Sequence, residues 1–244
     1  MSIKIDGENF NFQDGMTILQ VINAFKIEHP QICYLPEVDP IETCDTCIVE
    51  VDGSLLRACS TKAISGMSIS LSSSGAKEAQ TEAMDRILEN HLLYCTVCDN
   101  NNGNCKIHNT VDMMEIEHQK YPYEPKCTEE RTDFTHPFYR YDPNRCIACG
   151  QCVEACQNLQ VNETLTMDWE RDRPIVLWDN GAKINDSSCV GCGHCITVCP
   201  CNALMEKSML GEAGFMTGMK EEIMSPLIDL IKDVEPGYSG IMAV

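Results

Sequence analysis

The sequence predicts an α+β protein made of several small domains, and three observations support this. Short alternating strand patterns and one amphipathic helix pattern fill the first 75 residues, a longer helical pattern follows, and a cysteine-rich stretch occurs twice after residue 141. A chain of 244 residues is long enough for two or three small domains.

Cysteine is the most unusual feature of the composition. The chain has 17 cysteines, an odd number, and it begins MSIKIDGENF with no basic and apolar leader. Both observations argue against a secreted disulfide framework. In a reducing compartment, dense cysteine indicates metal ligation, so we expect a cytoplasmic metalloprotein.

The charge balance disfavours one class of partner. Asp and Glu number 37 against 18 Lys and Arg, which gives a formal net charge of −19. Such a surface repels a phosphate backbone, so no nucleic-acid partner is expected. It suits docking to a basic face of a partner subunit or electron acceptor. No apolar run is long enough to span a bilayer, so we expect a soluble chain that is not transmembrane.

The first predicted domain covers residues 1–75. IKIDGENFNF alternates apolar and polar residues around an Asp-Gly turn, which predicts a hairpin, and CIVEVDGSLLRAC predicts a second hairpin turning at Asp52-Gly53. Between them, Thr17 can cap a short helix. The apolar residues of that helix are Ile18, Leu19, Val21, Ile22 and Phe25.

Four cysteines of this domain have a spacing suited to a 2Fe–2S cluster. They are Cys33, Cys44, Cys47 and Cys59, in the order C-x10-C-x2-C-x11-C. A C-x2-C pair with two flanking cysteines is the ligand pattern of plant-type ferredoxins, although the first gap here is ten residues and theirs is four. The surrounding hairpins and helix fit a β-grasp 2Fe–2S ferredoxin domain. Zinc remains the alternative for this motif.

The second predicted domain covers residues 76–135 and is small and helical. Residues 72–75 are expected to form a linker, residues 76–93 a helix and residues 107–118 another, with irregular chain up to residue 140. This predicted helix places His91 on its apolar face near its end. A histidine there is commonly a packed core residue.

Three cysteines close to His91 favour ligation instead. The order is His91-x3-Cys95-x2-Cys98-x6-Cys105. Three thiolates leave a cluster or a zinc ion one ligand short. The flanking cluster motifs favour a 4Fe–4S site with one histidine and three cysteine ligands. Neutral imidazole in place of thiolate removes a negative charge, which raises the reduction potential.

The third predicted domain, residues 136–206, contains an internal repeat. CIACGQCVEAC at 146–156 recurs as CVGCGHCITVC at 189–199, and each reads C-x2-C-x2-C-x3-C. In a bacterial two-cluster ferredoxin the fourth cysteine of each run ligates the other cluster. We therefore expect two 4Fe–4S clusters, for which zinc is a weak alternative because its sites normally use paired C-x2-C knuckles. Their predicted ligands are Cys146, Cys149, Cys152 and Cys199 for one, and Cys189, Cys192, Cys195 and Cys156 for the other.

The remaining residues carry no comparable signal. Cys127 and Cys201 are left over and are expected to be packed or idle thiols. The Met-rich tail, residues 207–244, has near-helical apolar spacing that ordinary core packing explains. No glycine-rich phosphate loop and no catalytic constellation is found, so no catalytic residue is assigned. The other histidines are expected to be structural or surface residues: His29, His108, His118, His136 and His194.

The order of these sites resembles a known electron-transfer module. A 2Fe–2S domain, a histidine-ligated 4Fe–4S site and a two-cluster ferredoxin domain occur together in iron-only hydrogenases and in diaphorase subunits of NAD-reducing hydrogenases. Beyond the ligands, the sequence is most similar to the N-terminal iron–sulfur region of cytoplasmic formate dehydrogenase alpha subunits of Gram-positive bacteria. The stretches that carry this resemblance are PIETCDTCIVEVDG, LYCTVCDNNNGNCKIHNT, HPFYRYDPNRCIACGQCVEACQ and GEAGFMTGMKEEI.

The resemblance implies an electron relay within an oxidoreductase. In those enzymes the chain continues into a domain that holds a molybdenum or tungsten bis-molybdopterin guanine dinucleotide cofactor and oxidises formate to CO2. No such domain follows here, so a fragment is suspected. The relay would pass electrons between that domain and an external acceptor or a small partner subunit. The candidate acceptors are a ferredoxin, NAD through a diaphorase, or a quinone. The alternative is a free-standing diaphorase-type subunit or an accessory region of an iron-only hydrogenase.

Overall fold

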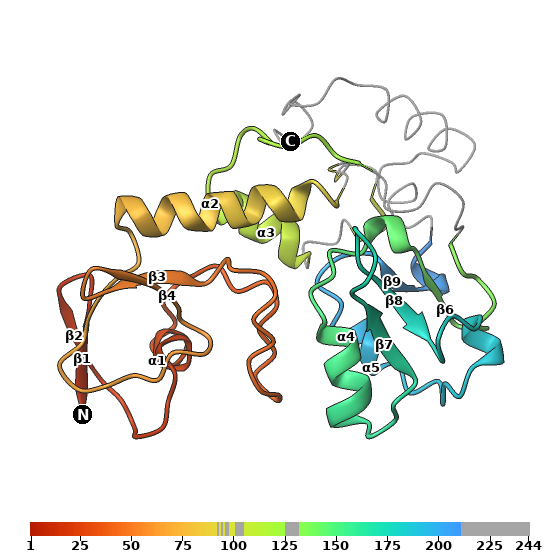
Figure 1. Cartoon of the computed structure of the whole chain (residues 1–244), viewed down its shortest axis with the longest axis horizontal. Helices are drawn as coiled ribbons and strands as arrows, with labels where there is room; N and C mark the ends of the chain where they lie inside the picture. The colour runs from red at the N-terminus through yellow and green to blue at the C-terminus, as the bar shows by residue number, and fades with distance from the viewer. Residues whose placement is uncertain (92, 94, 96–97, 101–104, 125–131, 211–244) are drawn as a thin grey trace. The chain divides into compact units, whose positions relative to one another are not determined.

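The computed structural model describes residues 1–91, 93, 95, 98–100, 105–124 and 132–210. The chain divides into two compact units, Met1–Met84 and Asp85–Val244. Each unit contains both strands and helices (Figure 1). The expected mixture of helix and strand in small domains is therefore confirmed.

The first unit is organised around a five-stranded sheet in the order β2-β1-β5-β3-β4. β1 pairs antiparallel with β2 and parallel with β5, while β3 pairs antiparallel with both β4 and β5. The strands are β1 (Ser2–Ile5), β2 (Glu8–Asn11), β3 (Ile48–Val51), β4 (Ser54–Arg57) and β5 (Ser68–Ser70).

Both predicted hairpins are confirmed, and their turns explain them. Asp6 and Gly7 have φ of 44° and 91°, and Asp52 and Gly53 have φ of 49° and 86°. Two consecutive residues with positive φ form the turn that matches the twist of paired strands, and Asp-Gly tolerates it well.

The predicted short helix is α1 (Ile18–Ala24). The Thr17 hydroxyl accepts from the Gln20 backbone N–H at 3.2 Å, and the Gln20 side chain accepts from the Thr17 N–H at 2.8 Å. This reciprocal pair is a capping box, which satisfies two N–H groups that the helix itself leaves unpaired. Ile18, Leu19, Val21 and Ile22 are fully buried, in one core with residues of the sheet.

The expected apolar role of Phe25 is only partly confirmed. Phe25 follows the last residue of α1 and is 46% exposed. Its ring still meets Phe10 edge-on, with centroids 4.9 Å apart. The helix ends before the apolar stripe reaches this position, so Phe25 lies at the margin of the core.

Thr17→Ala is expected to destabilise the first unit by about 1 kcal/mol, because the side-chain half of the capping box is lost. The measurement is the denaturation midpoint of this unit. Thr17→Ser is the matched control, since serine keeps the capping oxygen, and it should lie close to wild type. Equal destabilisation by both variants would contradict the capping explanation.

The next helix, α2 (Ser74–Leu88), differs from its prediction at both ends. Ser74 and Gly75, expected in a linker, belong to the helix, and the Ser73 hydroxyl accepts from the Ala76 N–H at 3.2 Å. At the other end the helix stops at Leu88 rather than 93. Asn90 N–H donates to Ile87 O and His91 N–H to Leu88 O. Both bonds reach the residue three positions back, and not four as in an α-helix. His91 therefore lies beyond the helix.

The following helix, α3 (Lys106–Met113), is shorter than the predicted range of 107–118. Glu115 has a φ of 53°, a left-handed conformation that ends a right-handed helix. Its N–H donates to Asp112 O, and the Ile116 N–H donates to Val111 O. Both bonds use carbonyl groups near the end of the helix, as helix termini require.

The cysteine-repeat region combines two small sheets with short helices. β6 (Tyr139–Tyr141) pairs antiparallel with β9 (Leu204–Glu206), and β7 (Leu165–Asp168) pairs antiparallel with β8 (Ile175–Trp178). The β7–β8 pair lies between the two cysteine motifs in the sequence. The helical segments are η2 (Pro143–Arg145), α4 (Gln151–Glu154), η3 (Ala155–Leu159), η4 (Ile184–Asp186), α5 (His194–Thr197) and η5 (Lys207–Met209).

Some predictions lie outside the described residues. They concern Cys127 and most of the Met-rich tail, residues 211–244. In the part of the chain that the structure describes, no helix is both long enough and apolar enough to cross a membrane.

Candidate iron–sulfur sites

The first candidate site consists of Cys33, Cys44, Cys47 and Cys59, all buried in the first unit. Cys47 directly precedes β3 and Cys59 follows β4, and the Ala58 N–H donates to Cys47 O at 3.1 Å. The base of one hairpin therefore brings two of the four thiols together. We call these four cysteines the 2Fe–2S site.

The other two thiols come from the loop between α1 and β3. Cys33 N–H donates to the Cys44 sulfur at 3.4 Å, and that sulfur lies 3.2 Å from the Thr46 hydroxyl. The hydrogen bond from Cys44 lowers the pKa of the Cys33 thiol to about 5. The Cys59 thiol has a lowered pKa because of its hydrogen bond with Cys47. The four predicted ligands are thus brought together.

Charged side chains brace this loop from outside. The Arg57 Nε donates to the Asp45 carboxylate at 2.5 Å, and Ser60 Oγ donates to Glu42 at 2.9 Å. Asp45 and Glu42 both have positive φ, 58° and 59°. These contacts hold a loop that has little regular structure around the thiols.

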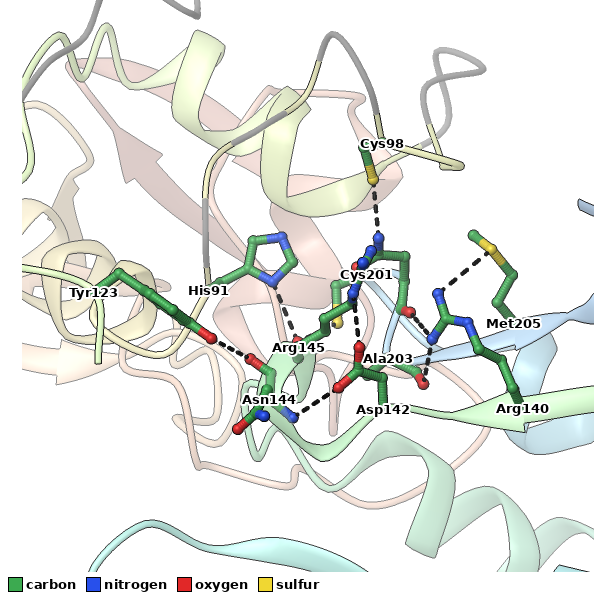
Figure 2. A network of polar contacts seen from close by, with 11 residues as sticks. His91, Cys98, Tyr123, Arg140, Asp142, Asn144, Arg145, Cys201, Ala203 and Met205 are labelled. Carbon is green, nitrogen blue, oxygen red and sulfur yellow. Dashed lines mark hydrogen bonds and ion pairs between the residues drawn. The ribbon is translucent and has the colours of Figure 1, made fainter. Parts of the chain in front are cut away.

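The second candidate site, here called the middle site, consists of His91, Cys95, Cys98 and Cys105. The His91 imidazole is buried, and its Nδ1 lies 3.2 Å from the Arg145 carbonyl oxygen (Figure 2). A carbonyl only accepts, so Nδ1 carries the proton and Nε2 keeps its lone pair. Burial lowers the pKa of His91 to about 4, which keeps it neutral near pH 7. A neutral imidazole held by its other nitrogen is how a histidine metal ligand is normally oriented.

The three thiols of the middle site are partly buried. Burial raises the pKa of Cys95 to about 11 and that of Cys98 to about 12. Charge repulsion from Cys105 adds to both shifts. Metal binding requires the thiolate, so filling this site must release protons.

The third and fourth candidate sites are two separate pockets lined by cysteines. We call them the first and second ferredoxin sites. The first is lined by Cys146, Cys149, Cys152 and Cys199. The second is lined by Cys156, Cys189, Cys192 and Cys195. Each cavity takes three thiols from one run and the fourth from the other, as the motif predicts.

The two runs adopt the same backbone conformation. Gly150 before α4 and Gly193 before α5 both have a φ of 80°, which glycine adopts without strain. The Ala148 N–H donates to the Cys146 sulfur at 3.4 Å, and the Gly191 N–H to the Cys189 sulfur at 3.5 Å. The repeat in sequence is therefore a repeat in structure, with equivalent N–H donors to sulfur.

Aromatic side chains line both ferredoxin sites. Tyr141 and Tyr139, on β6, line the first and second cavity respectively. The Tyr139 hydroxyl lies 2.8 Å from the Cys189 sulfur, and the Tyr141 hydroxyl accepts from the Val176 N–H at 3.0 Å. Burial raises the pKa of both tyrosines, so both hydroxyls stay protonated. Cysteine spacing gave no signal for either tyrosine, although the two alternate in FYRYDPNRC just before the first motif.

Cys201, expected to be packed or idle, is buried and lines the first ferredoxin cavity. Its sulfur lies 3.9 Å from the Cys199 sulfur and 3.3 Å from the Arg145 carbonyl oxygen. The contact with Cys201 lowers the pKa of Cys199 to about 7. No three His, Cys, Asp or Glu side chains within the described ranges converge on a single-ion site.

Comparison with known protein families gives three matches along the chain. Residues 1–74 match a 2Fe-2S iron-sulfur cluster binding domain, and residues 80–120 match the NADH-ubiquinone oxidoreductase-G iron-sulfur binding region. Residues 145–203 match a 4Fe-4S dicluster domain. Binding of both cluster types is thus supported by sequence families as well as by the cysteine pattern.

Curated relatives match the whole chain. The protein named "Putative formate dehydrogenase YrhE" of Bacillus subtilis is 69% identical over 100% of this chain, and "Probable oxidoreductase YjgC" of the same organism is 56% identical. A Staphylococcus aureus protein, also named as a formate dehydrogenase, is 50% identical over 99% of the chain. The chain spans about a quarter of the length of these relatives.

A solved structure shares the fold. It is an NAD+-reducing [NiFe]-hydrogenase in the H2-reduced state, with a TM-score of 0.76 and 24% identity. The match covers 85% of this chain and 87% of that chain. This likeness shows the fold, and the names of the curated relatives agree with the resemblance to the iron–sulfur region of formate dehydrogenases.

Proposed function

We propose that this chain, which corresponds over its whole length to the iron–sulfur part of formate dehydrogenase-like oxidoreductases, is an electron relay with one 2Fe–2S and three 4Fe–4S clusters. Iron–sulfur clusters take up and release single electrons. The proposed ligands are the four residues of the 2Fe–2S site, of the middle site and of each ferredoxin site, as defined above.

The observation that carries the proposal is the crossed composition of the two ferredoxin cavities. Cys199 lies with the three leading thiols of the first run, and Cys156 lies with those of the second. Both cavities are also lined by apolar side chains such as Met167, Val176 and Leu165. This donor set fits two thiolate-bound cubanes in a setting of low polarity.

The chain's own residues would space the clusters, keep water away and adjust their potentials. The N–H groups of Ala148 and Gly191 stabilise negative charge on the Cys146 and Cys189 sulfurs. The protonated Nδ1 of His91 leaves Nε2 for iron. These contacts act on the ligands directly, so they bear on redox potential as well as on cluster binding.

The finer fold assignment is also a proposal. The mixed five-stranded sheet with α1 in its core supports a β-grasp 2Fe–2S ferredoxin domain at 1–75. The remaining predicted domains are a histidine-ligated domain at 76–135, a two-cluster ferredoxin domain at 136–206 and a tail at 207–244.

The names of the relatives support a proposal for the activity of the whole protein. We propose that electrons from formate oxidation at a molybdopterin domain, in the remaining three quarters of such proteins, enter at the ferredoxin sites. They would leave through the middle and 2Fe–2S sites toward an acceptor or a small partner subunit. An acidic chain of net charge −19 suits docking to a basic acceptor face.

Iron content tests the cluster model. The full chain, prepared without oxygen and with every site filled, should contain about 14 iron atoms, two for the 2Fe–2S site and four for each other site. Less than half of that in a folded sample would overturn the four-cluster model, and zinc in place of iron would support the zinc alternative for the cysteine motifs. If the reading frame continued into no molybdopterin domain, the diaphorase-type alternative would replace the formate dehydrogenase proposal.

Cys47→Ser tests the direction of electron flow. In the complete enzyme this variant should damage the 2Fe–2S site and slow electron delivery to the acceptor, while reduction of the ferredoxin clusters by formate persists. Stopped-flow spectroscopy with formate and then acceptor measures both steps. Unchanged delivery to the acceptor would show that the 2Fe–2S site is not on the exit side.

A further inference from the structure

The segment after Cys199 contacts the middle site as well as the first ferredoxin site. The Asn202 side-chain Nδ2 donates to the Cys98 sulfur at 2.9 Å, and the Cys105 thiol lies 3.8 Å from the Pro200 carbonyl oxygen. Arg145, just before Cys146, accepts the His91 Nδ1–H through its carbonyl (Figure 2). Three of the four proposed ligands of the middle site are therefore held by residues adjoining the first ferredoxin site.

Asn202 is held firmly in position. It is 1% exposed, and its carbonyl accepts from the Arg140 guanidinium at 2.9 Å. Arg140 is itself buried on β6 and also donates to the Ala203 carbonyl at 3.3 Å (Figure 2). One buried cation therefore holds two consecutive backbone carbonyls, those of Asn202 and Ala203, and the burial of Asn202 limits how far its side-chain amide can turn away from Cys98.

An N–H group aimed at a ligand sulfur has a defined effect on redox chemistry. One-electron reduction of a 4Fe–4S cluster adds one negative charge, part of which lies on the sulfur ligands. A hydrogen-bond donor stabilises the reduced state more than the oxidised state and so raises the potential. The donor Asn202 is buried and Cys98 is partly buried, so the local dielectric is lower than that of water, which strengthens the contact.

We propose that Asn202 is a positioning residue that raises the reduction potential of the middle cluster by donating its side-chain N–H to the Cys98 sulfur. This inference rests on the proposed cluster at the middle site. It makes the chain immediately after the first ferredoxin motif responsible for the potential of the neighbouring histidine-ligated cluster. Asn202 and His91 then act in the same direction, since neutral imidazole also raises the potential.

The test is a dithionite titration of the full, cluster-loaded chain, followed by EPR of the middle cluster. Asn202→Leu keeps the side-chain size and removes the donor. It should lower the equilibrium constant for reduction about tenfold, which is about 59 mV for one electron. Asn202→Asp places a carboxylate at the same position and should lower it further. The other three clusters should keep their potentials.

Asn185→Asp is the matched control, because Asn185 is exposed in the same unit and the change adds the same charge. It should leave the middle cluster at its wild-type potential. An unchanged potential in both Asn202 variants would overturn the inference. Loss of the middle cluster alone from both variants would also overturn it, by assigning Asn202 to cluster assembly. A wild-type chain without a middle-cluster signal would instead refute the proposed function.

Discussion

Cys199→Ser is expected to remove or convert the cluster of the first cysteine run, although Cys199 belongs to the second. The reason is that Cys199 lines the cavity of Cys146, Cys149 and Cys152. Up to four of about 14 iron atoms per chain would be lost. Iron analysis together with low-temperature EPR of the reduced chain measures this.

Cys201→Ser is the matched control for Cys199→Ser. Cys201 lines the same cavity, and its sulfur lies 3.9 Å from that of Cys199, so the two substitutions act at nearly the same place. The Cys201 variant should keep its full iron content. Equal iron loss from both variants would refute the proposed ligand set.

The reciprocal variant, Cys156→Ser, should affect the cluster of the second run. Cys156 lines the cavity of Cys189, Cys192 and Cys195. If Cys156→Ser and Cys199→Ser disturbed the same EPR signal, the crossed arrangement would be wrong.

His91→Cys is expected to keep the middle cluster and to lower its reduction potential. A thiolate adds one negative charge where a neutral imidazole stood. Two histidines raise Rieske centres by roughly 250 mV or more over plant-type ferredoxins, so one exchange should cost on the order of 100 mV. His91→Ala removes the ligand altogether and should yield a chain with an incomplete or missing middle cluster. Potentiometric EPR distinguishes these outcomes.

His118→Cys is the control for the His91 variants, because His118 is exposed and no cysteine lies close to it in the sequence. It should leave every cluster potential unchanged. A His91→Ala chain with an unaltered middle-cluster signal would show that His91 is a packed core residue and not a ligand.

Several elements were predictable because their signals are local. The Asp-Gly turns at 6–7 and 52–53 follow from the positive φ that glycine and aspartate tolerate. The α1 start follows from the capping pair of Thr17 and Gln20. The cysteine runs were also predictable, since three of the four thiols of each ferredoxin site lie within seven residues of one another.

The end of α2 was not predictable from periodicity. Apolar spacing continues from Ala79 to His91, yet the helix stops at Leu88, where the chain turns through Asn90 and His91. An apolar periodic pattern indicates which residues face the core. A buried residue in a turn fits this pattern as well as a buried residue in a helix does. His91 is buried in either case, so its selection as a candidate ligand did not depend on the helix.

The sequence by itself determined which residue types could bind iron and in which groups, because motif spacing is a property of neighbouring residues. Only the tertiary structure decided what surrounds those groups. Asn202 and Cys98 are 104 positions apart, and the Arg145 carbonyl that orients His91 is 54 positions from it. Such contacts depend on how β6 and β9 pair and on the buried Arg140 of β6, which donates to the Asn202 and Ala203 carbonyls. Spacing along the chain carries no information about contacts of that kind, and in the proposed relay these contacts would orient the ligands and adjust the potentials.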